Sequence, residues 1–161
     1  MKAMLDYCVG GLEKRVRAGD ILLHEGGRTG HLFILIDGRV DVVRGDVVVA
    51  SISEPGAIFG EMSMLLDQDH SAAVRAQSDA TVYEIDDAAR FLRDQPEVAL
   101  LIAKLLARRL YVATTYLADL RRQYAGHGNH LAMVGDLLQS MINLAPAEVS
   151  PGSDRQSDPR I

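Results

Sequence analysis

The stretch PGAIFGEMSMLLDQDHSAAVRA, residues 55–76, contains the features that decide the fold. A proline–glycine turn leads into Phe59-Gly60-Glu61, a short apolar run of helical character follows, and a strand-like segment begins near Ser71. Free amides at the start of such a turn attract an anion, and a glycine lets a ligand approach the backbone closely. Ser71 and the amide of Ala72 could complete the cage. The stretch therefore predicts a phosphate-binding loop between two strands.

Glu61 conflicts with a phosphate ligand at first sight, because two negative groups repel each other. The conflict disappears if the carboxylate accepts a hydrogen bond from a hydroxyl of the same ligand. A ribose hydroxyl would meet that need.

The sequence around this loop has the period of a β protein. From about Gly19 to Ile85, short β-branched runs alternate with glycine-containing turns, without helical crossovers. This pattern predicts a mostly β fold, an antiparallel barrel or jelly roll. The tripeptide RGD at 44–46 is expected to form a tight hairpin, with Gly45 supplying the unusual backbone angle.

After Asp86 the apolar residues recur with the spacing of a helix. DDAARFLRDQ predicts one helix, and Pro96 opens a longer one from about Glu97 to Tyr124. The long helix has two apolar stripes. The first is Leu106, Leu110, Ala113, Leu117, Leu120 and Tyr124, and the second is Val98, Ile102, Leu105, Val112 and Tyr116. One stripe can cover the barrel, and the other favours a two-fold homodimer through helix 97–124.

The C-terminal part has a different composition. AGHGN at 125–129 breaks the helix, residues 131–144 predict a shorter amphipathic helix, and the following residues have the proline, serine and charge content of a disordered tail. We therefore expect a domain over residues 1–125 that includes the long helix, a short helical segment over 126–145, and a tail over 146–161.

Composition excludes several classes of protein. The 161 residues include one cysteine, Cys8, so a disulfide within the chain and a four-thiolate metal site are both excluded. No apolar run approaches the roughly 18 residues of a membrane span, and the N-terminus lacks the pattern of a signal peptide, so we expect a cytoplasmic protein. A net charge of −5 gives no general attraction to nucleic acid. HGNH at 127–130 lacks further ligands, so we expect no metal.

Residues 19–124 resemble a cyclic-nucleotide-binding domain, most closely the bacterial cyclic-AMP receptor type. The resemblance is carried by Gly19, Gly26, Gly38, Gly56 and Gly60, by FGEMSMLLDQDHSAAVRA, and by LLARRLYVATTYLADL in the long helix. It implies a β jelly roll with a phosphate-binding cassette, followed by a long dimerisation helix and, in this chain, a short extra helix.

The same resemblance implies the ligand contacts. Gly60 and Glu61 would meet the ribose 2′-hydroxyl, and Ser71 with the Ala72 amide would meet the cyclic phosphate. Thr114, with Thr115 beside it, would offer a hydroxyl to the purine. The neighbouring cassette residues Phe59, Met62 and Ser63 complete the predicted site, together with His70.

Two departures from the family pattern affect function. The family places an arginine on the phosphate where this chain has His70, and losing that charged partner should cost roughly 2 to 5 kcal/mol. Receptors of this type also continue into a winged helix-turn-helix, whereas the resemblance here stops within its first helix, VGDLLQSMINLA. We therefore expect that this chain alone does not bind DNA in a sequence-specific way.

Three functions remain open on the sequence. The first is a regulatory sensor, not an enzyme, that binds a cyclic nucleotide, cyclic AMP in preference to cyclic GMP, and signals through its dimer helix. The second is a degenerate fold with an empty or altered pocket that serves as a dimerisation or partner-binding module. The third is a transcription regulator whose DNA-binding part is lost or separate.

Overall fold

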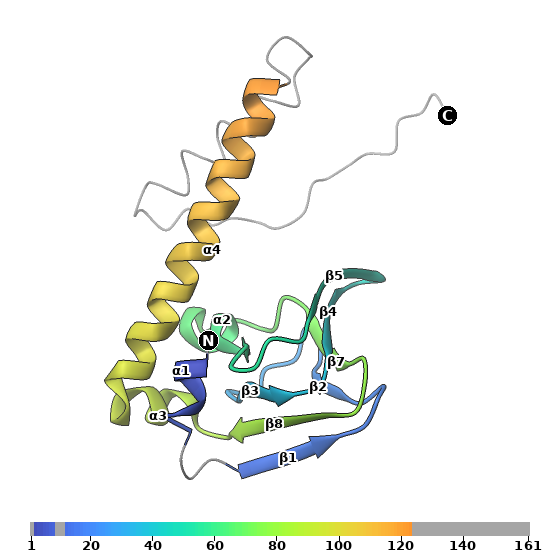
Figure 1. Cartoon of the computed structure of the whole chain (residues 1–161), viewed down its shortest axis with the longest axis vertical. Helices are drawn as coiled ribbons and strands as arrows, with labels where there is room; N and C mark the ends of the chain where they lie inside the picture. The colour runs from blue at the N-terminus through green and yellow to red at the C-terminus, as the bar shows by residue number, and fades with distance from the viewer. Residues whose placement is uncertain (1, 9–11, 124–161) are drawn as a thin grey trace. The chain divides into compact units, whose positions relative to one another are not determined.

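The structure is a computed structural model that describes residues 2–8 and 12–123. The chain divides into two compact units with the boundary between Leu106 and Ala107, and each unit is described by itself. The elements run in the order α1 (Lys2–Leu5), β1 (Leu12–Val16), β2 (Ile21–Leu23), β3 (Leu32–Asp37), β4 (Val40–Arg44), β5 (Val47–Ile52), β6 (Ile58–Phe59), α2 (Glu61–Leu66), β7 (Ala73–Ala76), β8 (Ala80–Ile85), α3 (Ala88–Asp94) and α4 (Pro96–Gln123) (Figure 1).

The strands form two four-stranded antiparallel sheets. One has the order β1-β8-β3-β6 and the other has the order β2-β7-β4-β5. Neighbours in a sheet are mostly distant in the chain, as in the pairing of Phe33 with Glu84 and of Asp41 with Arg75. This is the antiparallel jelly roll that the sequence predicts.

The core lies on both faces of the first sheet, and β3 shows why. Phe33 and Leu35 belong to a cluster with Val40 and Val74 of the second sheet, so they lie between the sheets. The alternate residues of β3, Leu32 and Ile34, point to the opposite face because side chains alternate along a strand. There they pack with buried residues of the helices: Met4, Ala88, Val98 and Ile102.

Cys8 belongs to this second cluster and is inert there. Its thiol donates to the Met4 carbonyl at 3.3 Å, and burial raises its pKa to about 11. The thiol stays protonated at neutral pH and behaves as a small apolar side chain.

The predicted hairpin is confirmed at 44–47. Gly45 has a φ of 60°, which a residue with a Cβ rarely adopts. Its amide donates to a carboxylate oxygen of Glu25 at 2.7 Å, which ties the hairpin tip to the loop after β2.

Three of the four described helices agree with the sequence prediction, α2, α3 and α4, whereas α1 was not predicted. α3 and α4 fall within the predicted ranges, while β1 and the two-residue β6 were not predicted. Tyr124, the break at 125–129, the helix expected over 131–144 and the tail from 146 lie outside the described residues. No helix in the described ranges combines the length and the apolar character needed to cross a bilayer.

Candidate ligand-binding site

Residues 59–76, here called the cassette, connect the two sheets. β6 ends at Phe59, Gly60 turns the chain into α2 with a φ of 94°, and β7 of the other sheet begins at Ala73. A Cβ atom on Gly60 would lie 2.4 Å from the carbonyl oxygen of His31. Glycine is therefore required at this position both by its backbone angle and by the close approach of the loop before β3.

The predicted residues at the start of the cassette differ in exposure. Phe59 pairs with Phe33 and is buried, and the Glu61 side chain is also buried, at 4% exposure. Met62 points outward and is 48% exposed.

The Ser63 hydroxyl donates to the Gln68 carbonyl at 2.5 Å, and the Gln68 amide donates to the Ser63 carbonyl at 3.1 Å. Ser63 thus closes the turn after α2, a structural role that the sequence did not indicate.

His70 is buried at 5% exposure under the loop that joins β2 to β3. Its backbone exchanges two hydrogen bonds with this loop, because its amide donates to the Gly27 carbonyl and its carbonyl accepts from the Gly26 amide, both at 2.8 Å. Its Nε2 lies 3.1 Å from the Thr29 hydroxyl oxygen. Burial lowers the pKa of His70, Asp69 opposes this shift, and His31 adds to it. The imidazole is therefore neutral at pH 7 in the free protein.

The two residues after His70 are the most accessible part of the predicted phosphate cage. Ser71 is exposed and Ala72 is half-buried, immediately before β7. In β7, Val74 and Ala76 are buried while Arg75 is exposed and lies 3.7 Å from Asp41. As the alternation predicts, Arg75 points to the outer face and does not replace the missing cassette arginine.

Thr114 and Thr115 lie in the part of α4 that belongs to the second unit. Both hydroxyls donate to helix carbonyls, Thr114 to Leu110 at 2.9 Å and Thr115 to Tyr111 at 2.8 Å. A hydroxyl that donates within the helix can still accept a hydrogen bond from a ligand. Their contact with a purine stays a prediction.

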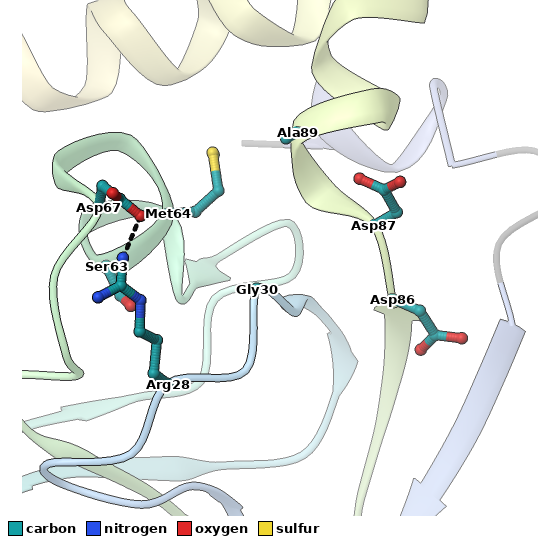
Figure 2. A pocket seen from close by; sticks show the side chains of 8 residues that line it. All are labelled: Arg28, Gly30, Ser63, Met64, Asp67, Asp86, Asp87 and Ala89. Atoms are coloured by element: carbon teal, nitrogen blue, oxygen red, sulfur yellow. Dashed lines mark hydrogen bonds and ion pairs between the residues drawn. The ribbon is translucent and has the colours of Figure 1, made fainter.

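A cavity of about 240 Å³ lies beside α2, between the loop before β3 and the start of α3 (Figure 2). Its lining consists of Arg28, Gly30, Ser63, Met64, Asp67, Asp86, Asp87 and Ala89. Arg28 pairs with Asp67 across its rim. Ser63 is the one predicted site residue in this lining, and three carboxylates against one arginine do not suit a phosphate. The cavity is therefore distinct from the predicted cage.

A charged cluster on the first sheet was missed by sequence reasoning. The Lys14 ammonium lies 2.8 Å from one oxygen of Glu84, and His31 Nδ1 lies 3.4 Å from the other. His31, Glu84 and Asp86 bring ligand-type atoms within 4.8 Å of one another. Lys14 already balances Glu84 with a positive charge, so we assign no metal to the cluster. Only the pairing of β8 with β1 and β3 brings these residues together, and no local motif signals it.

Comparison with known families matches residues 13–93 to the cyclic nucleotide-binding domain. The chain belongs to this family. Its relatives include the cyclic AMP receptor protein of Thermus thermophilus, 32% identical over 98 residues, which are 57% of this chain and 45% of that protein. The cAMP-dependent protein kinase regulatory subunit of Blastocladiella emersonii is 29% identical over 79 residues, 46% of this chain and 19% of the relative.

Solved structures support the fold of this cyclic nucleotide-binding domain. The crystal structure of Thermus thermophilus catabolite activator protein superposes with a TM-score of 0.61 at 23% identity, covering 87% of this chain and 79% of the other. The chain spans less than half the length of the two curated relatives. What the comparisons establish is a cyclic nucleotide-binding domain with the receptor-type jelly roll.

Proposed function

We propose that this chain is a regulatory sensor module, not an enzyme, which binds a cyclic nucleotide at the cassette and signals through α4 in a homodimer. The observation that carries the proposal is the family match over residues 13–93 together with a cassette folded as strand, glycine, helical turn and strand. Both relatives are named for cyclic AMP, which supports cyclic AMP over cyclic GMP as the ligand. A cytoplasmic location is part of the same proposal.

The proposed phosphate and ribose contacts use cassette residues of the first unit, and the proposed purine contact rests on the family resemblance. Ser71 and the Ala72 amide bind the cyclic phosphate at the accessible end of the cassette, and His70 lies next to them in the chain. Gly60 gives the ribose close access to the backbone, and the buried Glu61 carboxylate accepts from the 2′-hydroxyl. Thr114 and Thr115 contact the purine. Ligand then favours one packing of the α4 pair, by no more than its difference in affinity for the two packings.

Isothermal titration of the full chain with cyclic AMP and cyclic GMP at pH 7.5 tests the proposal. We expect saturable binding of one ligand per chain, tighter for cyclic AMP. No heat and no thermal shift at millimolar concentrations of either nucleotide would contradict it.

A second candidate function is favoured by one observation, a buried histidine in place of the permanently charged family arginine. On this reading the fold persists as a dimerisation or partner-binding module whose pocket no longer takes a cyclic nucleotide. The variant His70→Arg separates the two functions. An arginine restores a permanent charge-assisted contact worth roughly 2 to 5 kcal/mol, or about 30-fold to several thousand-fold in affinity.

If the native chain binds cyclic AMP and His70→Arg binds it more tightly, the sensor proposal stands. If only His70→Arg binds, the native pocket has lost this ligand. Gln77→Arg is the matched control. Gln77 is exposed just after β7, so an arginine there adds the same charge away from the predicted cage. An equal gain in this control would show that net charge, rather than a cassette contact, raises affinity.

A further inference from the structure

The Thr29 hydroxyl lies against one ring nitrogen of His70 and makes two contacts there. Its oxygen accepts a hydrogen bond from the His31 amide at 3.3 Å and lies 3.1 Å from His70 Nε2. A hydroxyl has one proton and two lone pairs, so it can accept from the amide and donate its proton to Nε2. We assign this pattern, in which Nε2 carries no proton and the single ring proton of the neutral imidazole is on Nδ1.

The other ring nitrogen is available to a ligand. Among the residues that the structure describes, Nδ1 of His70 has no hydrogen-bond partner, whereas every fully buried side-chain polar atom has one. Nδ1 is therefore not fully buried, although His70 as a whole is only 5% exposed. The backbone hydrogen bond between His70 and Gly27 holds the ring in this place. A Cβ atom added to Gly27 would lie 3.8 Å from Cδ2 of the ring.

The charged groups around His70 are compatible with a positive charge on its ring. Asp69, adjacent in the chain, favours the imidazolium, and His31 on the facing loop disfavours it. On the same loop, Arg28 is engaged by Asp67 at the end of α2, and Glu25 binds the Gly45 amide. An anionic phosphate at Nδ1 would add a second negative neighbour to Asp69 and would raise the pKa of the ring.

We propose that His70, positioned by Thr29, is the cation of the phosphate subsite. When a phosphodiester anion binds, His70 takes up one proton from solvent on Nε2. Nδ1–H donates to the phosphate, and the new Nε2–H donates to the second lone pair of the Thr29 hydroxyl, whose own proton turns to solvent. The inference rests on the proposed function. It makes ligand affinity depend on pH in a way that a permanently charged arginine would not.

Calorimetric titration with cyclic AMP in two buffers of different ionisation enthalpy, from pH 5.5 to 8, measures the protons taken up. We expect an uptake that approaches one proton between the pKa values of free and bound His70 and falls toward zero above both. Within that window affinity should weaken by up to roughly tenfold per pH unit as the pH rises.

Three variants separate His70 from other groups. His70→Arg should bind with no proton uptake and a flat pH profile. Thr29→Val keeps the side-chain shape but removes the acceptor for Nε2–H, so proton uptake should move to lower pH while His70 remains present. His31→Gln should retain the uptake, because His31 is a neighbour and not the proton acceptor.

The two proposals fail in different ways. Binding with equal enthalpy in both buffers and equal affinity from pH 5.5 to 8 would overturn the proton linkage and leave the sensor function standing. The same holds if His31→Gln abolishes the uptake. Absence of heat at every pH in both the native chain and His70→Arg would overturn both.

Discussion

At the scale of single residues, Gly60 and Gly19 provide a matched pair. Both have a φ of 94°, but a Cβ on Gly60 would lie 2.4 Å from the His31 carbonyl oxygen, whereas one on Gly19 meets nothing within 4 Å. Gly19→Ala should lower the free energy of unfolding by roughly 1 to 2 kcal/mol, the cost of the backbone angle alone. Gly60→Ala should lose about 1 to 3 kcal/mol more through the clash. Urea unfolding measures both, and equal losses would show that the close approach is absent.

The two serines of the cassette should respond differently to loss of the hydroxyl. Ser63→Ala removes the hydrogen bond to the Gln68 carbonyl and should lower stability by about 1 kcal/mol. Ser71→Ala removes an exposed hydroxyl and should leave stability unchanged while weakening cyclic AMP binding about fivefold to tenfold, the cost of one hydrogen bond. Thermal unfolding and calorimetry on both variants test this, and a reversed pattern would exclude our assignment of the two hydroxyls.

The sequence predicted some of these residue roles and missed others for physical reasons. Gly45 and Gly60 are visible from sequence because turns and close approaches demand glycine. The bond of Ser63 depends on where α2 ends, and the contact of His70 with Thr29 depends on two segments about 40 residues apart. Side-chain geometry of this kind needs the folded chain.

At the scale of elements, alternation and turn residues between Gly19 and Ile85 predicted β2, β3, β4, β5, β7 and β8. They did not predict β1, because LEKRV shows little apolar alternation and only Val16 is buried. β6 is two residues long, too short for a period to appear. Both strands exist because β8 and β3 offer them partners, which is a tertiary effect that local propensity does not show.

The first turns of α4 anchor that helix on the outer face of the first sheet. Val98 and Ile102 are fully buried there, while Leu100 between them is 56% exposed. Ile102→Ala should lower the free energy of unfolding by about 2 to 5 kcal/mol. Leu100→Ala, the matched control, should change it by less than about 0.5 kcal/mol. Similar losses in denaturant unfolding would mean that α4 does not pack as described.

At the scale of the whole molecule, the rest of α4 presents the apolar side chains expected of a dimer helix. Leu110 is 45% exposed and lies on the predicted stripe with Leu117. The double variant Leu110→Glu with Leu117→Glu should convert a dimer to a monomer in sedimentation velocity, because buried unpaired carboxylates are costly. Arg108→Glu, on the opposite side of the helix, should leave the dimer intact. A native chain that sediments as a monomer would contradict the predicted homodimer.

A crystal structure of the full chain grown with cyclic AMP tests the sensor function most directly. We expect one nucleotide per chain, with its phosphate on Ser71, the Ala72 amide and His70, and its ribose at Gly60 and Glu61. Side chains filling that space in crystals saturated with the nucleotide, or a nucleotide bound elsewhere, would contradict it.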